Sequence, residues 1–492
     1  MSTLITELFI LAGLLFFFGS IDELFIDLAH LIGGLTPLSI DKDQWKEWMQ
    51  FPEKPIAVMI PAWKEADVLE AMVKTNLARI QYSNFKWFIG VYPNDPETLS
   101  IAKKLEETYF DKIKVIVTDR PGPTSKAHCL NCILNEMEDS CSKAKSSWKP
   151  HYIAIHDAED VIHPYSFTAI NAQDGNHDFI QIPVFSLPTP ATAWVAGTYL
   201  DEFAEIHLKE IPVRQLLKMP IPSAGVGTFF SRKILTKLNS RFGYCFDEAN
   251  LTEDYEISQR ISRLEGKQMF LLVRDQKGEI LATREYFPDS LGRSIRQKTR
   301  WTTGIGMQTL AKWNRFGPHL SRKYWFRDWM AAYALYRDRK ALWANPSAFL
   351  GWFLACFFVA ASSTEYLERS IVDKDRHFLM ILFTLNAFLF GIRVVQRSRF
   401  TTSIYGITQG VFSVPRILPS NFINGMASLS AIRGYVSAKQ KGFVRPMVWD
   451  KTDHKFPKDC DLPEVTDFRE GPGLLQGKRA TSIVSEIYGN RS

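Results

Sequence analysis

Three carboxylates follow a short apolar run near the middle of the chain. Residues 152–155 have the composition of a buried β-strand, and Asp157, Glu159 and Asp160 come directly after it. In open α/β sheets, ligands bind at the carboxyl ends of the strands. Carboxylate oxygens suit a hard cation such as Mg²⁺ or Mn²⁺ that holds substrate phosphates. This stretch therefore predicts a site where a divalent cation meets a phosphorylated substrate, with these three residues as candidate metal ligands.

Other acidic residues stand at the ends of predicted elements. Glu65 and Asp95 follow two apolar runs, and Asp254 comes just after Thr252, a plausible helix N-cap. A single acidic residue at such a place is more often a helix cap than a ligand. By spacing alone, Asp254 is equally explained as an acid that the helix dipole stabilises. These positions gain functional meaning only as a series.

Two further stretches are candidates for contact with a ligand. Gly225 lies in a run of small residues at 222–228, which permits close approach of the backbone to a ligand, although an ordinary tight turn explains it too. Gln297, Arg300 and Trp301 lie in a basic helical stretch. The alternative for that stretch is an amphipathic basic helix on a membrane surface.

Strand and helix patterns alternate through the middle of the chain. We expect strands at 55–60, 85–92, 112–118, 152–155 and 179–184, with helices at 65–80, 97–109, 125–137 and 195–210. Short connections between alternating elements predict a parallel sheet with right-handed crossovers. No Gly-x-Gly-x-x-Gly motif follows the first strand, which counts against a dinucleotide-dependent oxidoreductase.

Apolar segments flank this α/β region. Residues 4–19, with an uneven apolar continuation to 35, and residues 343–363 and 378–395 are each about long enough to span a bilayer. The first basic residue is Lys42, so an uncleaved anchor with its N-terminus outside is expected, and the middle domain is placed in the cytoplasm. Asp22, Glu23 and Asp27 are costly in lipid, so we expect them at the interface or facing other helices.

Residues 404–425 are ambiguous because Pro415, Arg416 and Pro419 interrupt their apolar character. We interpret them as interfacial or re-entrant helices that leave the basic tail inside. The predicted domains are then an anchor at 1–40, a cytoplasmic α/β domain at 41–340, membrane and interfacial helices at 341–436, and a cytoplasmic tail at 437–492.

Composition narrows the class of protein. The net charge of +6 is spread too thinly over 492 residues to indicate nucleic-acid binding. The six cysteines include one Cys-x-x-Cys pair, Cys129 and Cys132, beside His128. One such pair is not a zinc site without a second. Reduced thiols on a helix of a cytosolic domain are therefore expected, with no disulfide framework.

Taken in order, these motifs resemble those of the processive family 2 glycosyltransferases of membranes, the group of cellulose and hyaluronan synthases. The resemblance runs from about residue 20 to about residue 458. The motifs that carry it are PAWKE at 61–65, YPNDP at 92–96, RPGPTSKA at 120–127, HDAED at 156–160, SAGVGT at 223–228, LTEDY at 251–255, QKTRW at 297–301 and WDKT at 449–452.

The resemblance implies a GT-A-type domain, with a Rossmann-like, mostly parallel sheet, attached to transmembrane and interfacial helices. It implies that Asp254 is the general base. The donor nucleotide and its diphosphate would be bound by Glu65, Asp95, Lys126, Asp157 and Arg300. The acceptor would be bound by Gln297, Trp301 and Gly225. One departure is Glu159, which stands where the family has a second aspartate, so Asp160 is kept as a further candidate ligand of Mg²⁺ or Mn²⁺.

The function implied is an inverting, metal-dependent transfer from a UDP-sugar to a growing surface or secreted polysaccharide. The expected location is the bacterial inner membrane, as a multi-pass protein. The expected partners are the donor, a glycan acceptor, the lipid bilayer and an outer-membrane or export protein, without nucleic acid. Two alternatives stay open: a catalytically degenerate scaffold or phage-receptor component, and transfer of one sugar to a lipid carrier.

Overall fold

The computed structural model describes residues 2–143, 148–173, 177–275, 277–308, 325–362, 373–440 and 455–457. The chain forms two compact units, each built from several segments. The helical unit consists of residues 1–35, 188–213 and 287–445. The sheet unit consists of residues 36–187, 214–286 and 446–492. The predicted boundary at 340/341 differs from this division, because residues 287–340 group with the apolar helices.

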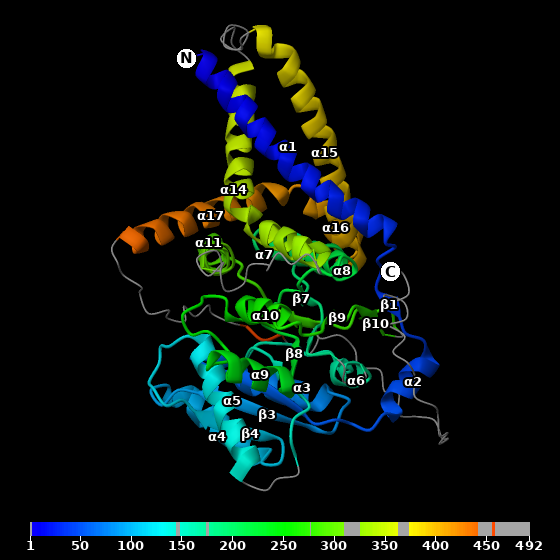
Figure 1. Ribbon diagram of the computed structural model, residues 1–492, viewed down its shortest axis with the longest axis vertical. Helices are drawn as coiled ribbons and strands as arrows, with labels where there is room; N and C mark the ends of the chain where they lie inside the picture. The colour runs from blue at the N-terminus through cyan, green and yellow to red at the C-terminus, as the bar shows by residue number, and fades with distance from the viewer. Residues whose placement is uncertain are drawn as a thin grey trace. The chain divides into compact units, whose positions relative to one another are not determined.

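The sheet unit contains a seven-stranded sheet with the strand order β4-β3-β2-β5-β8-β6-β9 (Figure 1). The strands of this sheet are β2 (Ile56–Pro61), β3 (Phe85–Val91), β4 (Ile113–Val117), β5 (Tyr152–Ile155), β6 (Phe179–Gln181), β8 (Thr228–Ser231) and β9 (Gln268–Phe270). Two small sheets pair β1 (Leu38–Ser39) with β10 (Val273–Arg274), and β7 (Val184–Ser186) with β11 (Thr283–Glu285).

The central strands are buried on both faces, which is why they are continuous apolar runs. Every residue of β2 is buried, and β2 pairs in parallel with β3 on one side and β5 on the other. The expected alternation of strand and helix is confirmed here. One strand differs: β8 runs antiparallel to both β5 and β6, because it follows directly on the small-residue loop at 222–227 instead of on a crossover helix.

The helices of the sheet unit connect these strands or cover the sheet. They are α2 (Lys42–Gln50), α3 (Ala66–Arg79), α4 (Pro96–Thr108), α5 (Lys126–Lys143), α6 (Ser166–Asn171), α9 (Arg232–Phe242) and α10 (Glu253–Arg263). The core between helices and sheet is aromatic, with Trp45, Trp87 and Phe229 fully buried. This packing fixes the strand ends that carry the candidate site.

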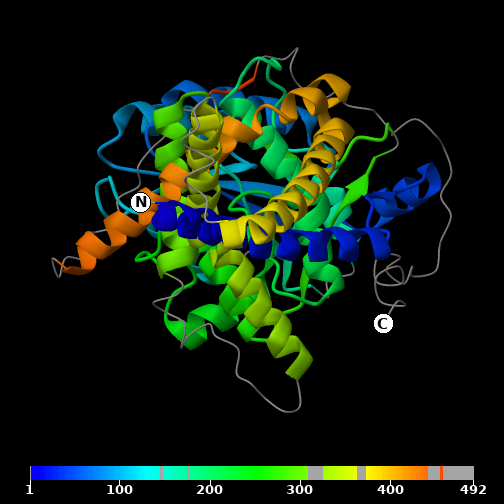
Figure 2. The same cartoon turned by 90° about the horizontal axis from the view of Figure 1, so that it is seen from above.

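The helical unit contains the remaining elements. They are α1 (Ser2–Ile32), α7 (Ala196–Glu205), the π-helical turn η1 (Ile206–Glu210), α11 (Leu291–Thr302), a second π-helical turn η2 (Thr303–Gln308), α14 (Trp325–Ser362), α15 (Asp373–Tyr405), α16 (Ile407–Ser413) and α17 (Ile417–Gln440). Helix α8 (Ile211–Leu216) begins in this unit and ends in the sheet unit. Helices α1 and α15 lie side by side, as Figures 1 and 2 show. In the described part of the chain, two stretches are long and apolar enough to cross a membrane, Thr6–Ile32 and His377–Tyr405.

The acidic residues of α1 face cationic residues of other helices. The Asp22 carboxylate lies 2.6 Å from Arg337 Nη1 of α14, and the Asp27 carboxylate lies 2.9 Å from Lys209 Nζ of η1. Glu23 adds a third contact, at 3.3 Å from Arg337 Nη2. The expectation that these acids face other helices is therefore confirmed.

The segment 404–425 is not one continuous helix. Helix α15 ends at Tyr405, Gly406 has a positive φ of 83°, and α16 and α17 follow as separate helices. Arg416, between α16 and α17, is fully buried and pairs with Asp201 at 2.7 Å. The motif at 449–452 and most of the predicted tail lie outside the described residues.

Candidate active site

The loops after β2 and β3 are joined by hydrogen bonds. Asp95 is the N-cap of α4, and its Oδ1 accepts a hydrogen bond from the Thr98 backbone N–H at 3.4 Å. Its Oδ2 accepts a hydrogen bond from the Lys64 N–H at 2.6 Å, and Thr98 Oγ1 accepts one from the Glu65 N–H at 3.0 Å. Glu65 and Asp95, both predicted to bind the nucleotide, are thus held in one network of adjacent loops.

In the turn after β5, the carboxylate of Asp160 is buried, whereas that of Asp157 is partly exposed. Asp160 is fully buried, and its Oδ2 lies 2.8 Å from His156 Nδ1 and accepts the Asp157 N–H at 3.1 Å. Burial, with the neighbouring carboxylates of Asp157 and Glu159, raises the pKa of Asp160 well above its usual range. Burial also lowers the pKa of His156 to about 3, so its imidazole is neutral. Asp160 therefore closes the turn, whereas the Asp157 side chain is 25% exposed.

Lys126 joins this turn to the start of α10. It is the first residue of α5, and its Nζ lies 2.5 Å from Asp157 Oδ1. Burial by itself would lower the pKa of Lys126, but the carboxylates of Asp157, Glu253 and Asp254 raise it above its usual range. One ammonium group is therefore held among carboxylates from two elements.

Asp254 lies against the small-residue loop. Its Oδ1 accepts a hydrogen bond from the Tyr255 N–H at 2.8 Å, as expected of an acid in the first turn of a helix. A Cβ atom at Gly225 would lie 2.7 Å from Asp254 Oδ2, and Gly225 has a φ of +84°. Only glycine fits this position without strain or displacement of the carboxylate.

Sequence reasoning missed the residue that holds this loop. Gln181, fully buried in β6, accepts hydrogen bonds from the Ala224 N–H at 3.0 Å and from Thr228 Oγ1 at 2.7 Å. Ser223 Oγ in turn accepts the Gly225 N–H at 3.2 Å. The signal available in the sequence was a single amide side chain inside an apolar strand, because such a group must find hydrogen-bond partners when buried.

The predicted acceptor residues Gln297, Arg300 and Trp301 lie on α11 of the helical unit. The Trp301 ring lies 6.2 Å, between centroids, from each of Tyr199 and Phe203 on α7. The neighbouring Lys298 is buried and also faces α7, with its Nζ 4.8 Å from the centroid of the Tyr199 ring.

Lys298 Nζ donates to Glu202 Oε2 at 2.5 Å and to Asn424 Oδ1 at 2.9 Å. Glu202 also accepts hydrogen bonds from Ser420 Oγ at 2.6 Å and from the Asn424 amide at 3.0 Å. Although burial opposes ionisation, Lys298 and Arg397 lower the pKa of Glu202 to about 2. This network fixes the rotation of α11 against α7 and α17.

Metal-binding residue types occur at three places in the sheet unit. Among the described residues, two groups have ligand atoms within 4.8 Å of one another: Asp119 with His128 and Cys132, and His163 with Asp275 and Glu279. The carboxylates at 157–160 do not converge in this way, because Asp160 turns toward His156. Mg²⁺ needs only one or two protein carboxylates when substrate phosphates and water complete its shell, so the partly exposed carboxylate of Asp157 is sufficient as a candidate ligand.

Comparisons with known proteins identify the family of the chain. Residues 52–304 match the family described as glycosyltransferase like family 2. Over 477 residues, 90% of the chain, the sequence is 34% identical to bacteriophage adsorption protein B of Escherichia coli K12. The motifs of the sequence also resemble those of a phage-adsorption inner-membrane protein, and this match confirms that resemblance. The chain spans 61% of the length of that relative.

Two solved structures are similar to the chain. A mannosyltransferase from Pyrobaculum calidifontis, in complex with GDP-mannose and Mn²⁺, has 15% sequence identity and a TM-score of 0.43, over 77% of this chain and 98% of that one. Glucosyl-3-phosphoglycerate synthase from Mycobacterium tuberculosis has 12% identity and a TM-score of 0.34, over 57% of this chain and 88% of that one.

Proposed function

The chain belongs to glycosyltransferase family 2, and from this membership we propose that it is an inverting, metal-dependent transferase that uses a UDP-sugar. It is a glycosyltransferase with a GT-A-type, mostly parallel sheet. Beyond this family-level activity, we propose the identity of the donor, the need for a metal ion, inversion at the anomeric carbon and a location in the membrane. Its expected product is a surface or secreted polysaccharide extended by one sugar at each turnover.

The observation that carries the proposal is the position of Lys126. Its ammonium contacts Asp157, the candidate metal ligand, and is stabilised by the carboxylate of Asp254, the candidate base. A sugar nucleotide carries its negative charge on the diphosphate, next to the anomeric carbon. A cation that contacts a candidate metal ligand near a candidate base is suited to stabilise the leaving diphosphate, which supports the proposal.

Asp157 and Glu159 would hold Mg²⁺ or Mn²⁺, both hard cations that prefer carboxylate oxygens. The ion, when bound, neutralises charge on the diphosphate. Asp160 has a different role, because its Oδ2 faces both His156 Nδ1 and the backbone N–H of Asp157. We therefore assign Asp160 to positioning Asp157 rather than to the metal.

Asp254 would take the proton of the acceptor hydroxyl as that oxygen attacks the anomeric carbon. The sugar–phosphate bond breaks on the opposite face, and the nucleoside diphosphate leaves with the bond electrons. The partly exposed carboxylate beside Gly225 supports this role, because the absence of a side chain at Gly225 keeps Cβ atoms away from Asp254 Oδ2. Glu65 and Asp95 would bind the nucleoside, Arg300 the diphosphate, and Gln297 and Trp301 the acceptor.

The apolar helices support a location in the bacterial inner membrane. Thr6–Ile32 and His377–Tyr405 are long enough to span, and α1 is joined to α14 and η1 by ion pairs. Membrane-embedded helices would keep a growing glycan next to the site of synthesis, with an export partner completing its path. The name of the relative links it to bacteriophage adsorption, which a surface glycan or its synthesis machinery could serve.

The test is release of UDP by the full-length chain in isolated membranes, with a panel of UDP-sugars and Mg²⁺ or Mn²⁺. Turnover with at least one donor is expected, and Asp254→Asn is expected to lower it about 10²–10⁴-fold, the usual contribution of a general base. Glu265→Gln, an exposed acid just beyond the other end of the same helix, is the control and keeps full turnover.

Each outcome separates the alternatives. No turnover with any donor overturns the transferase and leaves a scaffold or phage-receptor component. Turnover that persists in Asp254→Asn overturns the assignment of the base. A product that carries one sugar on a lipid carrier replaces the polysaccharide.

A further inference from the structure

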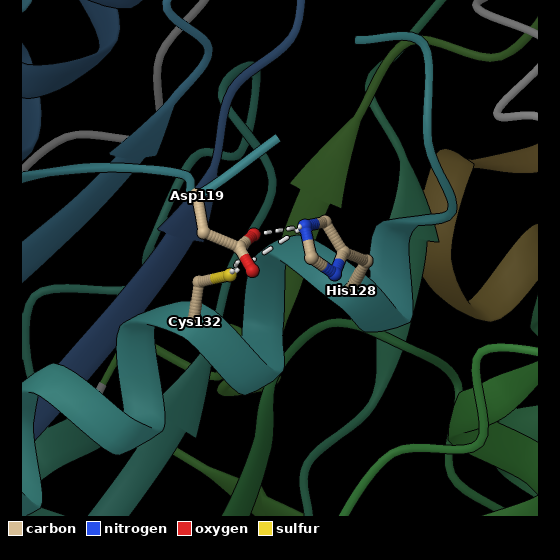
Figure 3. A group of neighbouring side chains, drawn as sticks. All are labelled: Asp119, His128 and Cys132. Atoms are coloured by element: carbon tan, nitrogen blue, oxygen red, sulfur yellow. Dashed lines mark hydrogen bonds and ion pairs between the residues drawn. The ribbon is translucent and has the colours of Figure 1, made fainter. Parts of the chain in front are cut away.

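Asp119, His128 and Cys132 form a cluster on the sheet unit that the transfer reaction does not use. His128 and Cys132 are four residues apart on α5, so they project from the same face of the helix. Asp119 follows β4 and points toward both of them, as Figure 3 shows. One helix face and one strand end thus supply an imidazole, a thiol and a carboxylate at a single place.

The spacing of the three ligand atoms fits a tetrahedral ion. Cys132 Sγ lies 3.5 Å from Asp119 Oδ1 and 3.6 Å from His128 Nε2, and Asp119 Oδ1 lies 2.9 Å from His128 Nε2. With bonds of about 2.1 Å to nitrogen and oxygen and about 2.3 Å to sulfur, a tetrahedral zinc ion separates its ligand atoms by roughly 3.4–3.6 Å.

Two edges of the triangle therefore already have the required length. The third is a hydrogen bond that has to open by roughly half an ångström. The Asp119 side chain is 70% exposed, so it is free to make this movement. A thiol is a weak hydrogen-bonding group, so hydrogen bonding gives little reason for the sulfur to lie at this distance from both partners.

His128 is buried beside a carboxylate that could orient it as a zinc ligand. The imidazole is buried, and its Nδ1 lies 3.2 Å from Glu248 Oε1 and 2.5 Å from Arg120 Nη2. Arg120 also donates to Glu248 Oε2 at 2.8 Å. A histidine that binds zinc through Nε2 carries its proton on Nδ1 and usually donates it to a carboxylate. Glu248 is within reach to accept that proton, but Arg120 Nη2 now donates to Nδ1, so zinc binding through Nε2 requires Arg120 to withdraw and Nδ1 to take up the proton.

We propose that Asp119, His128 and Cys132 bind one zinc ion, with water at a fourth, open position. A thiolate and an imidazole select zinc over Mg²⁺, so this site is distinct in chemistry from the proposed donor metal at Asp157. Cys129, the other member of the Cys-x-x-Cys pair, is fully buried and takes no part in the triangle. The proposal does not depend on the proposed transferase activity.

The ion would connect the loop at 119–125 to α5. Gly122 in this loop exchanges two hydrogen bonds of 2.7 Å with Asn94, the neighbour of Asp95. The same loop ends at Lys126, the cation of the candidate active site. Zinc bound at one end would therefore restrict a loop that borders the nucleotide-binding residues.

The test is zinc binding by the full-length chain, purified in detergent without a histidine tag and stripped with a chelator. Titration against a chromophoric chelator is expected to give one tight site per chain. Cys132→Ser is expected to weaken binding more than tenfold, and Glu248→Gln about 10–100-fold, as for other residues that orient a metal ligand. The control, Cys129→Ser, leaves zinc binding unchanged, and so does Asp157→Asn, which removes the donor-metal ligand.

Cobalt gives a second readout that does not depend on zinc affinity. A Co²⁺-loaded chain is expected to show a thiolate-to-cobalt charge-transfer band in the near ultraviolet, which Cys132→Ser removes and Cys129→Ser retains. The proposal is overturned if Cys132→Ser binds zinc as tightly as the unmodified chain, or if the charge-transfer band is absent from the unmodified chain.

Discussion

Lys126 is the cation that the carboxylates of the candidate site surround. Its ammonium is close to Asp157, and three carboxylates raise its pKa. Because burial works in the opposite direction, the cation persists only while those carboxylates remain ionised. Lys126 therefore stays charged throughout the neutral range, and its contribution to donor binding should not change with pH there.

Lys126→Met removes this cation while keeping most of the side-chain volume. We expect kcat/KM for the UDP-sugar to fall about 10–100-fold, because a hydrogen bond to a charged group contributes about 1.5–3 kcal/mol. The loss should be the same at pH 6.5 and pH 8.5. Steady-state UDP release measures it, with Lys104→Met on the exposed face of α4 as the control. A loss confined to one end of the pH range would contradict this account.

Gly225→Ala tests whether the small-residue loop leaves the space that the Asp254 carboxylate needs. The added Cβ would lie 2.7 Å from the carboxylate, so we expect kcat to fall more than tenfold with a smaller change in the KM of the donor. Gly243→Ala is a matched control, since Gly243 has a φ of +81° and no atom within 4 Å of its added Cβ. Both variants carry backbone strain of roughly 1–2 kcal/mol, but only Gly225→Ala meets the base.

Equal losses of turnover in the two glycine variants would show that strain, and not contact with Asp254, explains the effect.

His163 gives the sheet unit a dependence on acid. Burial, assisted by Arg284 and Arg79, lowers the pKa of His163 to about 3, below the value of about 6.5 in an unfolded chain. The unfolded state therefore binds the extra proton first, and stability present above pH 6.5 is lost as the pH falls toward 3. The slope for one proton is roughly 1.4 kcal/mol per pH unit.

His163→Asn should remove this pH-dependent stability, because an amide does not titrate. Its oxygen can still accept the Tyr165 N–H that His163 Nδ1 accepts at 3.3 Å. Thermal unfolding at pH 7, 6, 5 and 4 measures the difference between the variant and the unmodified chain. We expect the difference to move in favour of the variant as the pH falls. A difference that stays constant over this range would sink the prediction.

The ordered series of motifs predicted more of the candidate site than the spacing of single acidic residues did. Lys126, Asp157 and Asp254 belong to three separate motifs, and the structure brings them together. Asp160 could not be assigned from the sequence, because nothing in its type says that its carboxylate turns back to His156. Gln181 was missed because its role depends on β8 lying antiparallel beside β6, which the local pattern does not contain.

At the scale of the elements, buried ion pairs join α1 and α14, and each helix supplies charges that would be costly to bury without a partner. Arg337 Nη1 lies 2.6 Å from Asp22, and Arg337 Nη2 lies 3.3 Å from Glu23 and 3.1 Å from Glu210. All four side chains are largely shielded from solvent. A buried ion pair is costly to break because the remaining charge loses its partner.

Arg337→Met removes one of the two cations that Asp22 and Glu23 share, the other being Lys340 at 2.8 Å and 2.7 Å, so we expect a destabilisation below the roughly 3–5 kcal/mol of a fully unpaired buried charge. Loss of monodisperse protein on heating in detergent measures it. The double variant Arg337→Met/Glu23→Gln should recover part of the loss, since it removes one of the carboxylates that otherwise compete for Lys340. Arg433→Met, at an exposed position of α17, is the control. Failure of the double variant to improve on Arg337→Met would argue for lost packing instead of lost charge.

The predicted elements agreed best with the structure where a local sequence pattern alone determines the element. The apolar runs that became β2, β3 and β4 are bounded by turn residues, and their strands lie within one or two residues of the predicted ends. Predicted helix 195–210 instead became α7 followed by the π-helical turn η1. The register of η1 brings Lys209 to Asp27 of α1, a partner about 180 residues away that no local pattern could indicate.

At the scale of the whole molecule, the helical unit decides how the chain meets a membrane. Helix α16 has seven residues, about 10 Å at 1.5 Å per residue, which is too short to cross a hydrocarbon core of about 30 Å. Helix α17 has 24 residues, but Ser420 and Asn424 on it bond to Glu202 of α7. In Figure 1, α17 runs crosswise to α1 and α15. Polar contacts of this kind favour an interfacial helix over a spanning one.

We therefore expect three crossings, by α1, the second half of α14 and α15, with the end of α17 on the cytoplasmic side. A topology reporter placed after Gln440 should read as cytoplasmic, as should one placed between α2 and β2. Reporters placed before α1, and between α14 and α15, should read as external. An external reading after Gln440 alone would mean that α17 spans. It would put the following basic residues outside, against the charge asymmetry that orients the other helices.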